Sequence, residues 1–229
     1  MDERLIVALD AADRDDALRL AEQLAPVIST FKVGLELFAA HGPLIVRELA
    51  ATGSHLFLDL KLHDIPNTVG RAICSLRALP GLRWLTVHTA GGRAMLDAAV
   101  EAAGKMPAPA VVGVTVLTSL GDADLGEIGV SGPPAAQVQR LADLALRCRL
   151  GGLVCSPREV ALLRQVCGPD FPLITPGIRP AGAPAADQKR VATPAEAIEA
   201  GASHLVVGRP ITAAAAPLDA ARRLLDTLP

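Results

Sequence analysis

Short, continuously apolar runs alternate along the chain with longer segments in which apolar residues recur at helical spacing. A run that is apolar on both faces is typical of a strand in a parallel sheet covered by helices. Eight such runs predict strands, at residues 5–9, 30–33, 56–60, 84–87, 110–116, 152–155, 172–175 and 204–207.

Amphipathic patterns between these runs predict the connecting helices, most clearly at 15–24 and 137–146. Asp13 and Thr193 are expected to begin helices, because their short side-chain oxygens can accept the free N–H groups of a first turn. Pro194 and Glu196, which follow Thr193, favour the same interpretation.

Eight βα units in 229 residues match a TIM (β/α)8 barrel, which takes about 250 residues. A doubly wound open sheet is the alternative, but it usually has fewer strands, and no G-x-G-x-x-G turn follows the first run. We therefore predict an α/β fold, a single barrel domain over 1–229. Two long connections, 118–133 and 176–190, are expected to be lids, binding loops or plain surface insertions.

Composition excludes several classes of function. The composition, with 51% hydrophobic residues, is that of a globular protein. The formal net charge of −2 provides no general electrostatic attraction to nucleic acid or to anionic membranes. No Tyr and a single Trp leave few platforms for base stacking. No apolar run approaches the roughly 20 residues that span a bilayer.

The location expected from the sequence is cytoplasmic. The acidic start of the chain fits no signal peptide, and no pair of cysteines makes a C-x-x-C. We expect four reduced thiols, at Cys74, Cys148, Cys155 and Cys167.

The most informative segment is Asp59-Leu-Lys61-Leu-His-Asp64, at the end of the third predicted strand. Residues two apart on a strand point to the same side, so Asp59 and Lys61 are expected to lie side by side. Neighbouring carboxylates favour a protonated lysine. Such an ammonium can stabilise a carbanion and then protonate it, whereas a Schiff-base lysine needs an apolar or cationic neighbourhood.

Other charged residues follow the neighbouring strands. Asp10 comes after the first strand and Lys32 lies late in the second. Because barrel enzymes keep their active groups at the carboxyl ends of the strands, five charges are expected to meet at one mouth, namely Asp10, Lys32, Asp59, Lys61 and Asp64.

A phosphate site is predicted after the eighth strand. Gly208 permits close backbone approach, and Arg209 provides a forked cation at a helix start. Arg179 and Gln188, on the preceding long connection, are placed to close over the same anion, as barrels frequently bind phosphate after strands seven and eight.

Taken together, these segments resemble the orotidine 5′-phosphate decarboxylase family over nearly the whole chain. The matching segments are 7–10, 32–38, 57–68, 114–118, 176–179, 187–190 and 206–211. The D-x-K-x-x-D core is shared with sugar-phosphate decarboxylases of similar barrels. Its extension through Ile65-Pro-Asn-Thr68, with Lys32 and Arg209 present, is more specific.

The resemblance implies a homodimer that converts orotidine 5′-phosphate to UMP and CO2, the last step of de novo UMP synthesis, with no metal or organic cofactor. Lys32, Asp59, Lys61 and Asp64 would form a charged network, with Lys61 the proton donor to C6 of the pyrimidine.

The resemblance also implies the substrate contacts. Asp10 and Lys32 would hold the ribose, and Thr118 with Ser119 the base. The residues on the phosphate would be Arg179, Gln188, Gly208 and Arg209. Asp64 and Thr68 would reach the site of the neighbouring subunit, so that each site needs both chains.

Two alternatives remain at this level. One is a metal-dependent decarboxylase of a sugar phosphate that uses the same Asp-Lys-Asp core. The other is an inactive barrel that binds a nucleotide or phosphate as a sensor. The five histidines have no metal-ligand spacing, and they are expected to pack or to face solvent; His63 should point away from Lys61, and whether His88 lines the pocket is open.

Overall fold

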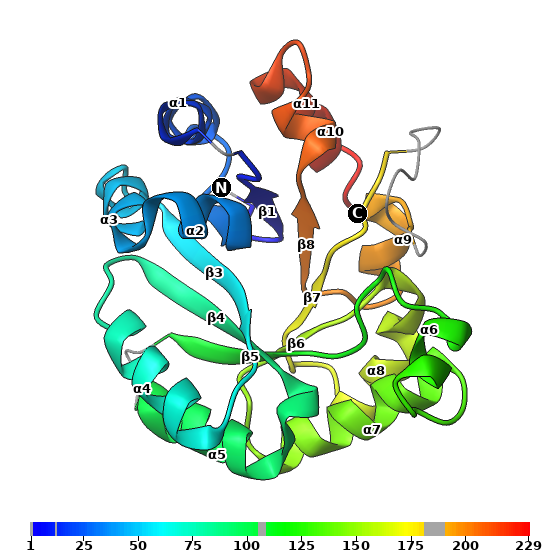
Figure 1. Cartoon of the computed structure of the whole chain (residues 1–229). Coiled ribbons are helices and arrows are strands. Elements are labelled where there is room, and N and C mark those ends of the chain that lie inside the picture. The colour runs from blue at the N-terminus through cyan, green and yellow to red at the C-terminus, as the bar shows by residue number, and fades with distance from the viewer. Residues whose placement is uncertain (1, 12, 105–108, 181–190) are drawn as a thin grey trace.

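The computed structural model describes residues 2–11, 13–104, 109–180 and 191–229. Eight parallel strands form a closed barrel in chain order, with helices around it (Figure 1). The strands are β1 (Leu5–Ala8), β2 (Thr30–Gly34), β3 (His55–Leu62), β4 (Leu82–His88), β5 (Ala110–Val114), β6 (Leu153–Val154), β7 (Leu173–Thr175) and β8 (His204–Val207).

The predicted TIM barrel is confirmed. Each of the eight predicted runs overlaps one strand, and β1 pairs with β8, which closes the sheet and excludes the open alternative. The largest differences lie at strand ends: β5 stops at Val114, and β3 continues to Leu62.

The helices lie between the strands in the expected order. They are α1 (Arg14–Leu24), α2 (Leu35–His41), α3 (Pro43–Ala51), α4 (Pro66–Leu76), α5 (Gly92–Ala103), α6 (Asp122–Glu127), α7 (Pro134–Arg147), α8 (Val160–Cys167), α9 (Pro194–Glu199), α10 (Arg209–Thr212) and α11 (Pro217–Leu225), with short 3-10 turns η1 (Thr89–Gly91) and η2 (Pro157–Glu159). No helix among the described residues is long and apolar enough to cross a membrane.

Both predicted helix starts are confirmed. The Asp13 carboxylate accepts the Asp16 N–H at the start of α1, and Thr193 and Glu196 cap each other's backbone at the start of α9. The connection 118–133 is not simply a loop, because it contains α6. Of the connection 176–190, residues 181–190 lie outside the described part of the chain.

Alternation along the strands separates two cores. Outward side chains such as Leu56, Leu58 and Leu85 pack under the helices. Inward side chains form a smaller cluster inside the barrel, made of Ile6, Ala8, Phe57, Trp84, Val112, Ile174 and Val206. The inner cluster is an apolar floor, above which the next inward positions carry the charged residues of the candidate site.

Aromatic contacts build part of this floor. The Phe57 and Trp84 rings pack edge to face, with centroids 6.0 Å apart, and the His204 ring lies 4.8 Å from that of Trp84. The Arg83 guanidinium lies over the Trp84 ring, 4.3 Å from its centre.

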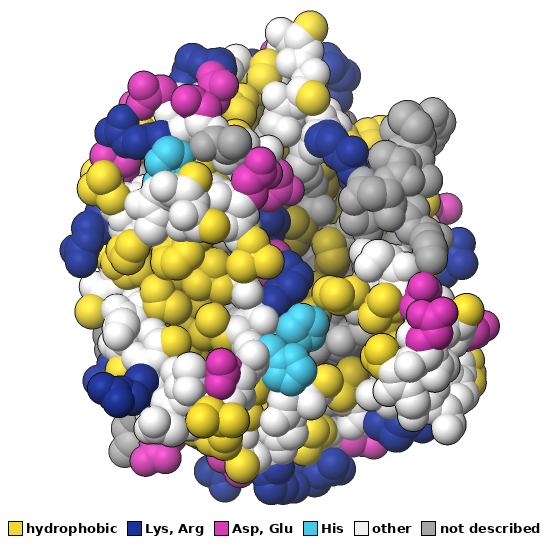
Figure 2. All heavy atoms as spheres, in the orientation of Figure 1, with side chains coloured by type: hydrophobic (Ala, Val, Ile, Leu, Met, Phe, Trp, Pro, Cys, Tyr) yellow, Lys and Arg dark blue, Asp and Glu magenta, His cyan; other side chains and the backbone are white. Residues whose placement is uncertain are grey.

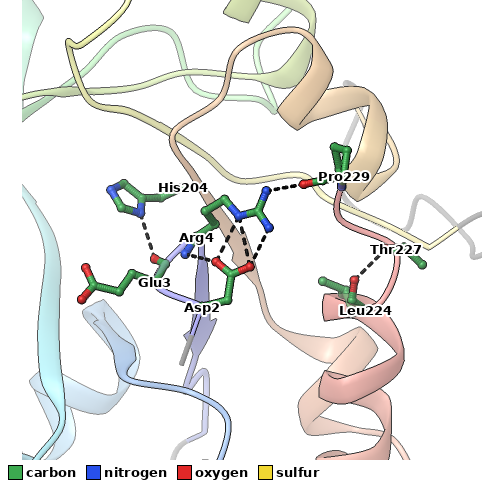
Figure 3. A network of polar contacts seen from close by, with 7 residues as sticks. All are labelled: Asp2, Glu3, Arg4, His204, Leu224, Thr227 and Pro229. Carbon is green, nitrogen blue, oxygen red and sulfur yellow. Dashed lines mark hydrogen bonds and ion pairs between the residues drawn. The ribbon is translucent and has the colours of Figure 1, made fainter.

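Residues 2–4 form hydrogen bonds with His204, at the start of β8, and with Pro229 (Figure 3). His204 Nδ1 donates to the Glu3 carbonyl at 3.0 Å. Arg4 binds the Asp2 carboxylate and donates to the Pro229 carbonyl at 2.8 Å. Burial lowers the pKa of His204, and although the Glu3 carbonyl opposes this, the pKa stays below its ordinary value.

This lowered pKa predicts a loss of stability in mild acid. A histidine that is neutral in the folded barrel stabilises it fully above the unfolded pKa of about 6.5, and this contribution is lost as the pH falls below that value. Urea unfolding at pH 7.5 and 5.5 should show a larger fall in the free energy of unfolding for wild type than for His204→Asn, whose amide keeps a donor for Glu3. Equal falls in both proteins would contradict this.

Candidate active site

A cavity of about 400 Å³ opens at the carboxyl ends of the strands. Among the residues that line it are most of the predicted site residues, namely Asp10, Lys32, Asp59, Lys61, Thr118, Ser119, Arg179, Gly208 and Arg209. Its volume suits a small organic ligand. Figure 2 shows Lys or Arg and His side chains gathered at the middle of this face of the molecule.

Four charged side chains of alternating sign form a row along one wall of the cavity. Lys32 Nζ lies 2.8 Å from Asp10 Oδ1 and 3.8 Å from Asp59 Oδ2. Lys61 Nζ lies 2.8 Å from the same Asp59 oxygen. The prediction that alternating charges meet at one mouth is therefore confirmed for these four residues, whereas the fifth predicted charge, Asp64, does not line the cavity.

Asp59 is the centre of this row and is buried, with 8% of its surface exposed. Burial by itself raises the pKa of the carboxyl, but the charges of Lys32 and Lys61 and a hydrogen bond from Thr86 outweigh it and hold the pKa below its ordinary value. The carboxylate is therefore ionised at neutral pH while facing an apolar floor.

A bulge in β3 presents Lys61 to the cavity. Leu58 pairs with Leu85 and Leu62 pairs with Val87, so three residues of β3 lie opposite Thr86 alone. Lys61 has a φ of 51°, a left-handed conformation that costs a residue with a side chain roughly 1–2 kcal/mol. Asp59 and Lys61 share a side as predicted, but simple strand alternation is only part of the reason.

A glycine at the end of β2 leaves room for the ion pair between Lys32 and Asp10. A Cβ added to Gly34 would lie 2.9 Å from Lys32 Nζ and 3.2 Å from Asp10 Oδ1. Any side chain at this position would displace the ion pair between these two residues.

The predicted phosphate residues follow β7 and β8, and β8 pairs with β1. Arg209 begins α10 directly after Gly208, and Arg179 follows β7. Arg179 Nη1 donates to the Ile178 carbonyl at 2.9 Å, which helps to orient its guanidinium. Gln188 lies outside the described residues.

Among the predicted site residues that the structure describes, Asp64 and Thr68 do not line this cavity. Both are exposed, and Asp64 accepts the backbone N–H of Ile65 at 2.6 Å. Ile65, the residue after Asp64, is 65% exposed, and Leu35 at the start of α2 is 59% exposed. Figure 2 shows hydrophobic side chains between α2 and α4 on the same face.

His63 and His88 form a tilted pair near Lys61, with ring centroids 5.5 Å apart. Neither residue lines the cavity. Burial, then the neighbouring His63 and Lys61, lower the pKa of His88. Within the described part of the chain, no three His, Cys, Asp or Glu side chains converge to hold a metal ion.

Several cavity residues were not predicted from the sequence. Phe57 and Val206 supply apolar walls, and Ser156 lines the cavity at the amino end of η2. Thr86 does not line the cavity but binds two residues of the charged row. Alternation within the fourth predicted strand, with Leu85 and Val87 outward, was the one signal that Thr86 faces inward.

Comparisons with known proteins agree with this geometry. The model of the family described as "Orotidine 5'-phosphate decarboxylase / HUMPS family" matches residues 3–224. Curated relatives named orotidine 5′-phosphate decarboxylase include one from Alkalilimnicola ehrlichii, 52% identical over 96% of this chain and 94% of that protein. Another, from Anaeromyxobacter sp. (strain K), is 54% identical over 97% of this chain and 96% of that protein.

A solved structure has the same fold. The crystal structure of orotidine 5′-phosphate decarboxylase from Lactobacillus acidophilus is similar with a TM-score of 0.86 and 37% identity, over 99% of each chain. The family match over nearly the whole length, the close relatives and the shared barrel establish that the chain belongs to the orotidine 5′-phosphate decarboxylase / HUMPS family.

Proposed function

We propose that this chain, acting as one domain, decarboxylates orotidine 5′-phosphate to UMP and CO2, the last step of de novo UMP synthesis, without a metal or organic cofactor. The observation that carries the proposal is the row of charges from Asp10 to Lys61 along the wall of the cavity. Curated relatives at about half identity bear the name of this activity. A cytoplasmic location fits the four free cysteine thiols.

The substrate is proposed to lie across the cavity with its phosphate at Arg179, Gly208 and Arg209. Gln188 is a further candidate for this group. Asp10 and Lys32 would then meet the ribose hydroxyls. Thr118, with Ser119, would meet the base. In this orientation C6 of the pyrimidine points to the Asp59–Lys61 end of the row.

The difficult step is breakage of the bond between C6 and the carboxylate. The bonding pair stays on C6 as a vinyl carbanion with no conjugated electron sink, and CO2 leaves. The Lys61 ammonium would stabilise this charge and then transfer a proton to C6, while the resulting amine regains a proton from water. Contacts at the phosphate, remote from C6, hold the ring in place for this transfer.

A homodimer with shared sites is part of the proposal. Asp64 and Thr68 are exposed and lie outside their own chain's cavity, and the apolar residues Leu35 and Ile65 are exposed as well. Apolar side chains in such a position suit burial against a second copy. Asp64 would then complete the network Lys32–Asp59–Lys61 of the partner's site.

The first prediction concerns Lys61. Replacement by Ala should lower turnover of orotidine 5′-phosphate by about 10²–10⁴-fold, since a positioned proton donor is lost, while UMP binding is largely kept. An ultraviolet assay of substrate consumption and a UMP titration measure both. Arg19→Ala, which removes an exposed cation on α1, is the control; unchanged turnover in Lys61→Ala would exclude Lys61 from the mechanism.

The second prediction tests the shared site. Mixing Lys61→Ala chains with Asp64→Ala chains should restore up to about a quarter of wild-type activity, because half of randomly reassorted dimers are hybrids with one intact site of two. Mixing Lys61→Ala with Asp59→Ala places both defects in residues of one chain's own cavity and should restore nothing. Verified heterodimers without rescue in the first mixture would argue against sharing.

The third prediction separates this activity from a metal-dependent sugar-phosphate decarboxylase. Turnover of orotidine 5′-phosphate should be unchanged in excess chelator. Loss of activity that Mg²⁺ restores would favour the metal-dependent alternative, and binding of UMP without any turnover would favour a sensor.

A further inference from the structure

Thr86 lies beneath the charged row, in a position that no substrate contact explains. It is on β4, and none of its surface is exposed. Its side chain faces the barrel interior, as does that of Trp84 two residues earlier in the floor. It is absent from the residues that line the cavity.

Its hydroxyl makes two hydrogen bonds whose directions are fixed by chemistry. The Lys61 backbone N–H can only donate, and it reaches Thr86 Oγ1 at 2.8 Å. The hydroxyl hydrogen is thereby left for Asp59 Oδ1, at 3.0 Å. Both oxygens of Asp59 then act as acceptors, Oδ1 for Thr86 and Oδ2 for Lys61, which leaves neither oxygen to carry a proton and favours the ionised carboxylate.

The two oxygens of Asp59 are in this way divided between two partners. Oδ1 takes the Thr86 hydroxyl, and Oδ2 takes the Lys61 ammonium at 2.8 Å. Rotation of the carboxylate would break one bond or the other. Thr86 therefore holds the plane of the group that orients the proposed proton donor.

The same hydroxyl also stabilises the bulge of β3. The three residues 59–61 lie opposite Thr86 alone, so the regular ladder between β3 and β4 is interrupted there. At this interruption the Thr86 hydroxyl accepts a hydrogen bond from the Lys61 backbone N–H. Lys61 has its left-handed conformation at the same point. One side chain thus fixes both the backbone and the partner carboxylate of Lys61.

We propose that Thr86 is a positioning residue for the decarboxylation: through one hydroxyl it sets the backbone of Lys61 and the orientation of Asp59, without touching the substrate. The inference rests on the proposed function, since it assigns Thr86 a role in that reaction.

The barrel offers a matched control in Thr30. It is also fully buried, and it faces inward on β2, on the other side of β3 from β4. Within the described part of the chain, its hydroxyl has no hydrogen-bond partner. Thr30→Val exchanges a hydroxyl for a methyl group, as Thr86→Val does, but removes no hydrogen bond to the charged row.

The test compares steady-state turnover of orotidine 5′-phosphate and UMP affinity in wild type, Thr86→Val, Thr86→Ser and Thr30→Val. Thr86→Val should lower kcat by about 10–100-fold, as expected when a reacting group is displaced by about 1 Å, with KM and UMP affinity nearly unchanged. Thr86→Ser should recover most of kcat, and Thr30→Val should behave as wild type.

A pH profile adds a readout that a purely structural role would not change. The hydroxyl helps to lower the pKa of Asp59, so its loss should move the acid limb of the kcat profile to higher pH. The other groups acting on this carboxylate are Lys32 of β2, Lys61 of β3 and His88 of β4, and every variant keeps them.

Equal kcat in wild type and Thr86→Val would overturn the positioning role, as would equal losses in the Val and Ser variants. If Thr86→Val does not fold, Thr86→Ser and Thr86→Ala give the same comparison, since they differ only in the hydroxyl; equal kcat in that pair would overturn the proposal. Absence of turnover in wild type would instead overturn the proposed function.

Discussion

The ion pair between Lys61 and Asp59 is the interaction on which the rest of the site depends. An isolated carboxylate would not stay ionised above an apolar floor, and a lysine with no fixed partner would extend into solvent. Each charge therefore depends on the other, and Lys32 and Asp10 continue the same alternation across two further strands. The barrel supplies what this arrangement needs: neighbouring strand ends within a few ångströms and a rigid layer beneath.

Separation of the two cores makes this rigidity possible. Outward residues fix the strands to the helices, while the inner cluster of Phe57, Trp84 and their neighbours packs the barrel interior beneath the charged row. The backbone strain at Lys61 persists because the surrounding bonds determine its position, as is common where a side chain must be aimed at a reacting group.

Much of this could be predicted from the sequence. Eight runs that are apolar on both faces predict the parallel barrel. The order of strands in a closed barrel then brings Asp10, Lys32 and Asp59 to one mouth. The register between β3 and β4 could not be predicted from the sequence, because the bulge in β3 and its pairing with Thr86 depend on how the two strands align. A single chain also cannot reveal which exposed residues serve another copy, as proposed for Asp64, since that depends on a surface rather than on local spacing.

The most direct measurement is a crystal structure of the protein with UMP bound. If a clamped ammonium delivers the proton, Lys61 Nζ should lie within about 3.5 Å of C6, still paired with Asp59, with the phosphate at Arg179 and Arg209. A structure in which another donor lies nearest C6, and the Lys61 side chain extends away from the pyrimidine, would contradict the mechanism.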